Sequence, residues 1–238
     1  HDDTGHNYRV AQQAKCLAQR LSLKLPQIRN IYLSGLLYQV GLHQLPEEMT
    51  DLAIEKMSFN QKILWEGFVT TSADIISDIA QFKSSANVIR HLHEHIDGSG
   101  LLHKLQAEIP IEAQLLSVII YYDLLLQGKV TGSCLSPNEA DERIKPLLGK
   151  ILDAKIYRLF KEMSANPAGD VFEIGISSRD LKENMVVAND IFNHLHNKLL
   201  SENSVLSQST IDSLISYEEK HKNSLLIYVK SVVEHNPP

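Results

Sequence analysis

The sequence predicts a mainly α protein: a helical domain over residues 1–166, followed by a small α+β module over residues 167–238. Apolar residues recur at helical spacing through the first two-thirds of the chain, and caps, prolines and glycines separate these runs. After Pro167 the apolar residues are mostly branched or aromatic and fall in short runs, which is typical of strands. Hydrophobic residues make up 43% of the 238 residues, enough to bury a core.

The first helices are delimited by local signals. An apolar face predicts a helix over residues 4–23, and a first-turn proline opens the next over 26–41, which ends at a glycine. The sequence Ser-Phe-Asn-Gln is a capping box that predicts a helix over 58–68. A separate helix is expected over 73–82.

The next four helices follow the same rules. A helix over 85–95 should stop at the glycine-rich loop that follows it. A strongly apolar helix is predicted over 110–126, and a Ser-Pro-Asn-Glu cap opens another that a glycine closes, over 136–149. Asp153 should cap the last helix of the domain, which is expected to end before Asn166.

The pattern of apolar residues changes at the predicted linker 166–169. Strands are expected over 171–177 and 185–192, a short helix over 209–220, and a closing strand over 225–233. This order of elements predicts a small α+β module.

Composition limits the functions to consider. The net charge of -6 argues against nucleic-acid or anionic-membrane partners. The longest apolar run, residues 115–126, is too short to span a bilayer and contains Asp123. Cys16 and Cys134 are too few for a disulfide framework and lie beside apolar residues, so we expect buried free thiols and a cytoplasmic location. The polar opening lacks a Met, so we expect further chain upstream.

Three stretches carry a family resemblance. These are "TGHNYRVAQQAKCLAQRL", "GLLYQVGLHQLP" and "IRHLHEHIDGSGLLHKLQAEIPIEAQLL". In order and spacing they resemble the HD-GYP domains, a branch of the HD phosphohydrolase superfamily, over nearly all of residues 1–165. The resemblance implies an HD-domain helical bundle. It also implies an iron or manganese cluster that activates water to attack a phosphodiester, with cyclic di-GMP as the family's substrate.

The resemblance also assigns the ligand positions, and most of them are changed. His6 and His93 match family ligands. Residues of other types stand at the remaining ligand positions, namely Tyr38, Gln39, Thr71, Leu92 and Ile120. Leu42 replaces the family lysine that would contact phosphate, and Leu101-Leu102 replace the Tyr-Pro of the signature. Because a hydrolytic metal needs His and carboxylate ligands from several helices, we interpret the segment as a metal site whose ligands are lost.

Alternative interpretations apply to the residues that remain. His6 and His93 also fit polar helix residues with hydrogen-bond partners. The signature loop, Asp97, Gly98, Ser99 and Gly100, also fits a plain helix-stopping turn.

A different enzyme class is suggested by one short motif. His91, Glu94 and His95 satisfy H-x-x-E-H, the inverted zinc-peptidase pattern, in which both histidines would share a helix face. Chance matches to so short a pattern are common in a His-rich stretch, and no third carboxylate ligand is evident.

The C-terminal module resembles the small module that follows HD-GYP-like regions in response regulators. Asn184, Asn197 and Asn203 stand where glycines are expected. Asn tolerates a left-handed backbone best among the other residues, so the turns can be kept.

These observations predict a catalytically inactive HD-GYP-like domain without a cofactor. It would be a signalling or scaffold module, the output region of a bacterial two-component or cyclic di-GMP-related regulator. The expected partner is a protein of the signalling pathway. By resemblance an upstream receiver domain is a second partner, and a homodimer is also considered. The alternative is an active metal-dependent phosphohydrolase with a rearranged Fe, Mn or Zn site, built from His6, His91, His93, His95 and Asp123.

Overall fold

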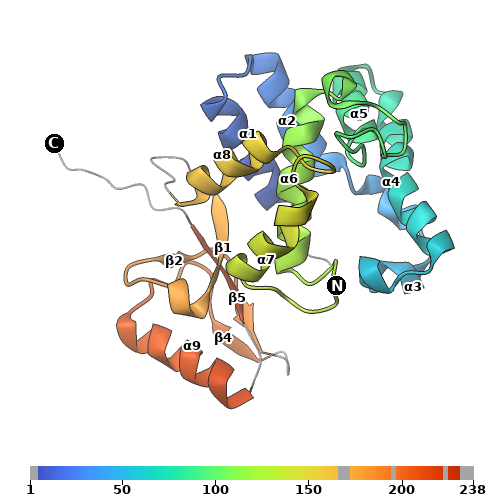
Figure 1. Ribbon diagram of the computed structural model, residues 1–238. Helices are drawn as coiled ribbons and strands as arrows, with labels where there is room; N and C mark the ends of the chain where they lie inside the picture. Colours follow the sequence, from blue (N-terminus) through green and yellow to red (C-terminus); the bar gives the residue numbers. More distant parts are fainter. Residues whose placement is uncertain (1–4, 166–171, 194–196, 222–224, 231–238) are drawn as a thin grey trace.

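A bundle of helices stands above a small sheet in the computed structural model, which describes residues 5–165, 172–193, 197–221 and 225–230 (Figure 1). The bundle contains α1 (His6–Arg20), α2 (Leu25–Leu37), α3 (Glu47–Thr50), α4 (Phe59–Ser77), α5 (Lys83–Arg90), α6 (Ile111–Leu126), α7 (Pro137–Ile144) and α8 (Ala154–Ala165). The fold class predicted from the sequence is confirmed.

Helix α1 lies at the centre of the bundle. Its apolar face, with Val10, Ala14 and Leu17, is fully buried against α2 and α6. The approach to α2 is close because Gly35 has no side chain: a Cβ there would lie 2.8 Å from the Cα of Ala11. Burial of apolar side chains along α1 is the main stabilising contribution to this part of the fold.

Several predicted helix boundaries were wrong. The helix expected over 26–41 ends at Leu37, and the one expected over 136–149 ends at Ile144. The expected pair over 58–68 and 73–82 is one helix, α4, because nothing between the two segments breaks a helix. Helix α5 ends at Arg90, so residues 91–95 lie in turns instead of on a helix face. The predicted caps are present: Ser58 and Ser136 close capping boxes, and the side chain of Asp153 accepts a hydrogen bond from the N–H of Ile156 at 2.8 Å.

The C-terminal module contains β1 (Glu173–Ser177), β2 (Val186–Val187), β3 (Ile191–Phe192), β4 (Lys198–Leu200), α9 (Gln208–His221) and β5 (Leu226–Lys230). Strand β5 is central in an antiparallel sheet of order β1-β5-β2, while β3 and β4 pair separately. The single strand expected over 185–192 is two short strands. Asn184 and Asn203 have φ of 68° and 65°, which fits the expected exchange of glycine for asparagine in turns.

The sheet packs directly on the helical bundle. Phe172 belongs to the helical core, and the amide nitrogen Nε2 of Gln13 on α1 donates to the backbone carbonyl of Glu173 at 2.7 Å. Gly175 on β1 lies so close to α6 that a Cβ would come within 3.1 Å of the side chain of Leu126. The second core cluster, beneath α9, is separate from the first.

Some expectations concern residues that the structure does not describe. The linker 166–169, the start of the first strand at 171 and the end of the last at 231–233 all lie outside the described residues, so the boundary between 166 and 167 stays a prediction. Cys16 is buried as expected, but Cys134 is exposed because it lies in the loop after α6. No helix in the described ranges has the length and apolar character needed to cross a membrane.

Gly41 should be intolerant of a side chain. A Cβ there would lie 2.6 Å from the carbonyl oxygen of Phe68 and 2.7 Å from the backbone nitrogen of Ser72. We expect Gly41→Ala to lower the free energy of unfolding by about 1–3 kcal/mol, as overpacking does elsewhere. Chemical denaturation measures the change. Gly67→Ala is the matched control: its methyl would meet no other heavy atom within 4 Å, so equal destabilisation by both substitutions would contradict the account.

Candidate functional site

A buried, hydrogen-bonded pair of side chains lies where the family resemblance puts the first metal ligand. His6 opens α1 and Asp123 lies near the end of α6, each only 2% exposed. The ring nitrogen Nδ1 of His6 is 2.5 Å from Oδ2 of Asp123. The two residues expected as independent candidate ligands are therefore bonded to each other.

The Asp123 carboxylate accepts hydrogen bonds from three further residues. Gln127 donates to Oδ2 at 2.8 Å and Arg9 at 3.5 Å, while the Tyr228 hydroxyl on β5 donates to Oδ1 at 3.1 Å. Burial alone would raise the pKa of Asp123, but the bond from His6 and the nearby charge of Arg9 outweigh it and lower this pKa. The carboxylate is thus held in its charged form.

Tyr38 occupies the other side of the His6 ring. Because Nδ1 faces a carboxylate, we assign the ring proton to Nδ1, which leaves Nε2 as an acceptor. The Tyr38 hydroxyl, at the C-terminal end of α2, forms a short hydrogen bond with Nε2. The lone pair that a metal would need is therefore bound to a tyrosine hydroxyl.

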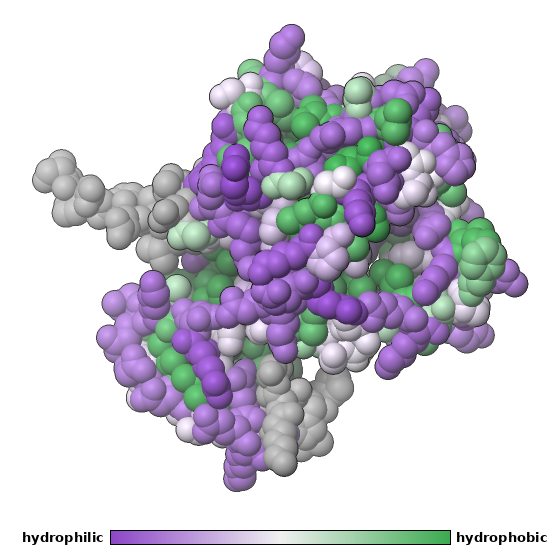
Figure 2. Space-filling view, in the orientation of Figure 1, coloured by the Kyte–Doolittle hydropathy of each residue, from purple (hydrophilic) through white to green (hydrophobic). Residues whose placement is uncertain are grey.

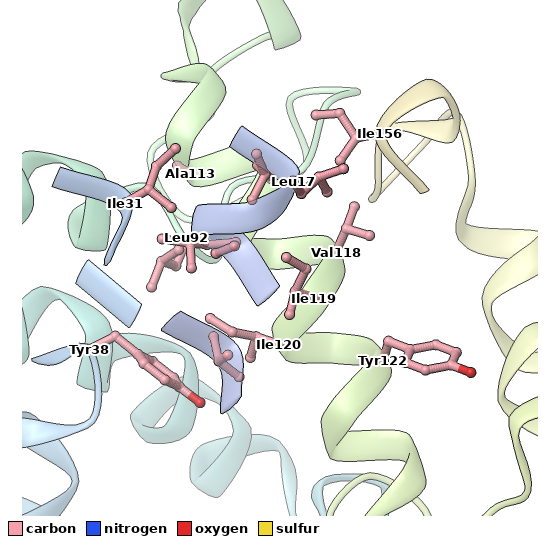
Figure 3. Close-up of a cluster of buried hydrophobic side chains, with 14 of the residues drawn as sticks. Leu17, Ile31, Tyr38, Leu92, Ala113, Val118, Ile119, Ile120, Tyr122 and Ile156 are labelled. Carbon is pink, nitrogen blue, oxygen red and sulfur yellow. The ribbon is translucent and has the colours of Figure 1, made fainter. Parts of the chain in front are cut away.

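The remaining positions at which the resemblance led us to expect ligands offer no strong electron-pair donors to a metal. Leu92 and Ile120 are buried in the helical core, and Figure 3 shows Ile120 projecting from α6 toward α1 and α2, away from Tyr122. Gln39 lines the pocket beside His6, and Thr71 lies partly buried on α4. As metal ligands, the apolar side chains of Leu92 and Ile120 and the neutral oxygens of Gln39 and Thr71 are poor substitutes for imidazole and carboxylate.

His93 is separated from His6 by aromatic rings. The ring of Phe68 lies between it and Tyr38, with centroid distances of 5.3 Å to His93 and 6.3 Å to Tyr38. Its Nδ1 donates to the backbone carbonyl of Glu66 at 2.9 Å. Burial lowers the pKa of His93 below its ordinary value of 6.5, although the bond to Glu66 opposes the shift.

The H-x-x-E-H pattern does not form a metal site here. His91 bonds to the carbonyl of Asn87 at 2.8 Å, and His95 lies 2.8 Å from the hydroxyl of Ser99. Glu94 is buried, and its carboxylate accepts backbone N–H groups from Leu102 at 2.5 Å and Lys104 at 2.8 Å. The glutamate that the motif would use as a base instead binds the backbone just after the signature loop.

The signature loop keeps a defined turn. Asp97 accepts two hydrogen bonds from Ser99, which lower the pKa of its carboxyl. Gly98 has a φ of 82°, which favours glycine. Gly100 packs so tightly that a Cβ would lie 2.6 Å from the backbone of Glu94 and His95.

A pocket of about 800 Å³ opens beside this network. His6, Asn7, Gln39 and Gln127 give it polar groups, and Trp65 gives it an aromatic wall. It opens the His6 side of the network to solvent.

Sequence reasoning missed the groups that complete the network. Arg9 and Gln127 could have been noticed, because they follow His6 and Asp123 by three and four residues and so share their helix faces. Tyr228 could not, because no local pattern relates residues 105 positions apart. Its ring also lies 3.9 Å from the Arg9 guanidinium.

Removing the Tyr228 hydroxyl should weaken the fold. Tyr228→Phe takes a donor from a buried carboxylate, and hydrogen bonds to charged groups contribute about 1.5–3 kcal/mol. We expect a loss of that size in the free energy of unfolding. Tyr8→Phe is the control, because within the described residues this exposed hydroxyl accepts a single surface hydrogen bond, from Gln12. Its loss should change stability by less than about 0.5 kcal/mol. Similar losses for the two variants would contradict the role of Tyr228.

The lowered pKa of His93 predicts a pH dependence. Below pH 6.5 the unfolded chain binds a proton on this ring while the folded chain resists it, so stability falls as the pH falls. One proton contributes a slope of at most about 1.4 kcal/mol per pH unit. His93→Gln should make the difference in unfolding free energy between pH 7 and pH 5 smaller. A variant with the full pH dependence of the parent would show that other groups cause it.

Several known proteins are similar to this chain. The 3'3'-cGAMP-specific phosphodiesterase 1 of Vibrio cholerae serotype O1 is 24% identical over 135 residues, 56% of this chain and 31% of that protein. Among solved structures, Bd1817, an HDG"Y"P protein of Bdellovibrio bacteriovorus, superposes with a TM-score of 0.59 at 21% identity, over 68% of this chain and 52% of the other. The cyclic GMP-AMP-specific phosphodiesterase V-cGAP3 of V. cholerae superposes with a TM-score of 0.53 at 17% identity, over 68% of this chain and 44% of the other. The chain thus spans about half or less of each relative's length.

These relatives correct one expectation. We expected no cofactor, but the HD-domain phosphohydrolases with which the chain groups are metal-dependent, so a metal belongs to the chemistry of the family. The residues of this chain do not fit such a cluster. Nε2 of His6 is bonded to Tyr38 and Asp123 is committed to four donors. Across the described parts of the chain, no three His, Cys, Asp or Glu side chains are grouped to hold an ion.

The sequence profile of the HD domain family matches residues 3–156, well over half of the chain. This range ends within α8, so the match covers the bundle and leaves out the sheet. The two structural matches independently show the same fold. The chain therefore belongs to the HD domain family.

Proposed function

We propose that this HD-GYP-type domain does not hydrolyse phosphodiesters and acts instead as a signalling or scaffold module through protein–protein contacts. One observation carries the proposal: the Tyr38 hydroxyl is hydrogen-bonded to Nε2 of His6, the atom that would otherwise face a metal. The apolar side chains of Leu92 and Ile120 support it, because neither can donate electrons to an ion. Without an activated water the hydrolytic nucleophile is missing.

The setting follows from the same resemblance. We place the domain in the output region of a cytoplasmic bacterial regulator of two-component or cyclic di-GMP-related signalling, downstream of a receiver domain. The intact bundle and the ordered signature loop support a retained binding role, since both are well packed without a catalytic centre. The partner would be a protein of the same pathway.

The parent protein should show no turnover of cyclic di-GMP or 3'3'-cGAMP above a buffer blank. Each substrate is incubated with the purified chain in manganese or iron(II), with and without a chelator, and linear and cyclic products are separated by chromatography. The expected rate is that of the blank in every condition. Turnover that a chelator abolishes and manganese restores would sink the proposal in favour of an enzyme with a rearranged site.

A four-residue variant is the matched comparison for the site. Tyr38→His, Gln39→Asp, Leu92→His and Ile120→Asp together restore the family's residue types. Without metal this variant should be less stable than the parent, at a cost of roughly 1–3 kcal/mol for each unpaired buried polar group. Manganese should then raise its Tm more than that of the parent, because binding to the folded state stabilises it. Equal stabilisation of both proteins would contradict the assignment of Tyr38.

A further inference from the structure

Helix α4 is apolar on both of its faces. Its inner face buries Phe68, Val69, Ala73 and Ile76 in the core. On its other face Phe59 is 78% exposed, and further apolar residues, Ile63, Leu64 and Ile75, are 50%, 52% and 45% exposed. A helix that is apolar all round is normally covered on all sides. Here α4 lies at the edge of the molecule, and Figure 2 shows hydrophobic residues gathered at that edge (Figures 1 and 2).

The N-terminal half of the helix presents a defined apolar surface, which we call the α4 face: Phe59, Ile63, Leu64 and Gly67. Residues 59, 63 and 67 are four apart and so lie along one side of the helix. A Cβ on Gly67 would meet nothing within 4 Å, which leaves open space next to the two large side chains. The surface therefore combines a projecting aromatic ring with a shallow notch.

The α4 face is complementary to a second copy of itself. Phe59 and Gly67 are each four residues from Ile63. If two α4 helices pack antiparallel about a two-fold axis at Ile63, Phe59 of each copy lies level with Gly67 of the other. A closed two-fold contact of this kind uses the same surface on both partners. The projecting ring of one copy then has room over the glycine of its partner.

Charge complementarity favours the same arrangement. Lys62 and Glu66 lie along one edge of the α4 face, and among the described residues neither makes an ion pair within its own chain. With the axis at Ile63, the antiparallel pair puts Lys62 of one copy two residues, or about 3 Å along the helix axis, from Glu66 of the other. The pair occurs twice in the dimer.

We propose that the α4 face is a homodimer interface in which two α4 helices pack antiparallel around Ile63. Only residues 59–67 overlap, so the contact is small compared with the roughly 800 Å² per partner of a standard interface. The dimer should therefore form reversibly and depend on concentration. This proposal goes beyond the signalling function and does not depend on whether the site hydrolyses a substrate.

Sedimentation velocity of the whole chain over a concentration series tests the proposal. The parent should shift from monomer to dimer as concentration rises. Ile63→Glu puts two like charges at the axis and should weaken dimerisation by at least roughly tenfold in Kd. Ile75→Glu, the same change at a similarly exposed position of α4 beyond the overlap, should leave Kd unchanged. Thermal unfolding at low concentration checks that each variant is folded.

A charge exchange makes the test independent of the apolar residues. Lys62→Glu and Glu66→Lys should each weaken self-association, because each places like charges together in both pairs. The double variant should regain it, and an equimolar mixture of the two single variants should form a heterodimer. A parent that stays monomeric up to millimolar concentration, equal effects of Ile63→Glu and Ile75→Glu, or single variants that dimerise as the parent does would each overturn the proposal.

Discussion

The charge on Asp123 is the constraint around which the centre of this molecule is arranged. A buried carboxylate without partners costs several kcal/mol, so its donors must be supplied by the surrounding structure. They come from α1, α6 and β5: His6 and Arg9, Gln127, and Tyr228. These elements are far apart in sequence, and their packing brings the donors to one point. The bundle and the sheet therefore meet at the place where a hydrolytic centre would otherwise be expected.

The charge of Asp123 is balanced by groups of the chain itself. A cluster of carboxylates and imidazoles needs metal cations to offset its negative charge. In this chain one carboxylate remains, and Arg9 and the hydrogen-bond donors around it satisfy its charge. Leu92 and Ile120, at two of the positions where the resemblance led us to expect ligands, contribute to the apolar core. The Tyr38 hydroxyl, at a third, is hydrogen-bonded to Nε2 of His6.

The sequence was informative where structure is local. The capping boxes at Ser58 and Ser136 and the left-handed asparagines follow from short-range rules and are present in the structure. It was ambiguous where a pattern could serve two purposes: Glu94 fits a catalytic motif, yet its carboxylate accepts hydrogen bonds from the backbone of Leu102 and Lys104. The links between His6 and Tyr38 and between Asp123 and Tyr228 could not be predicted from spacing, because helix packing and sheet docking alone create them.

The bond between Tyr228 and Asp123 also has a mechanical consequence. Hydrogen bonds weaken steeply beyond about 3.5 Å, so β5 can move by only a fraction of an ångström from α6 before this one is lost. From Asp123 the path to the pocket is short, because His6 and Gln127 both bind the carboxylate and both line the pocket wall. Strand β5 is thus linked to the pocket wall through two consecutive hydrogen bonds that share the Asp123 carboxylate.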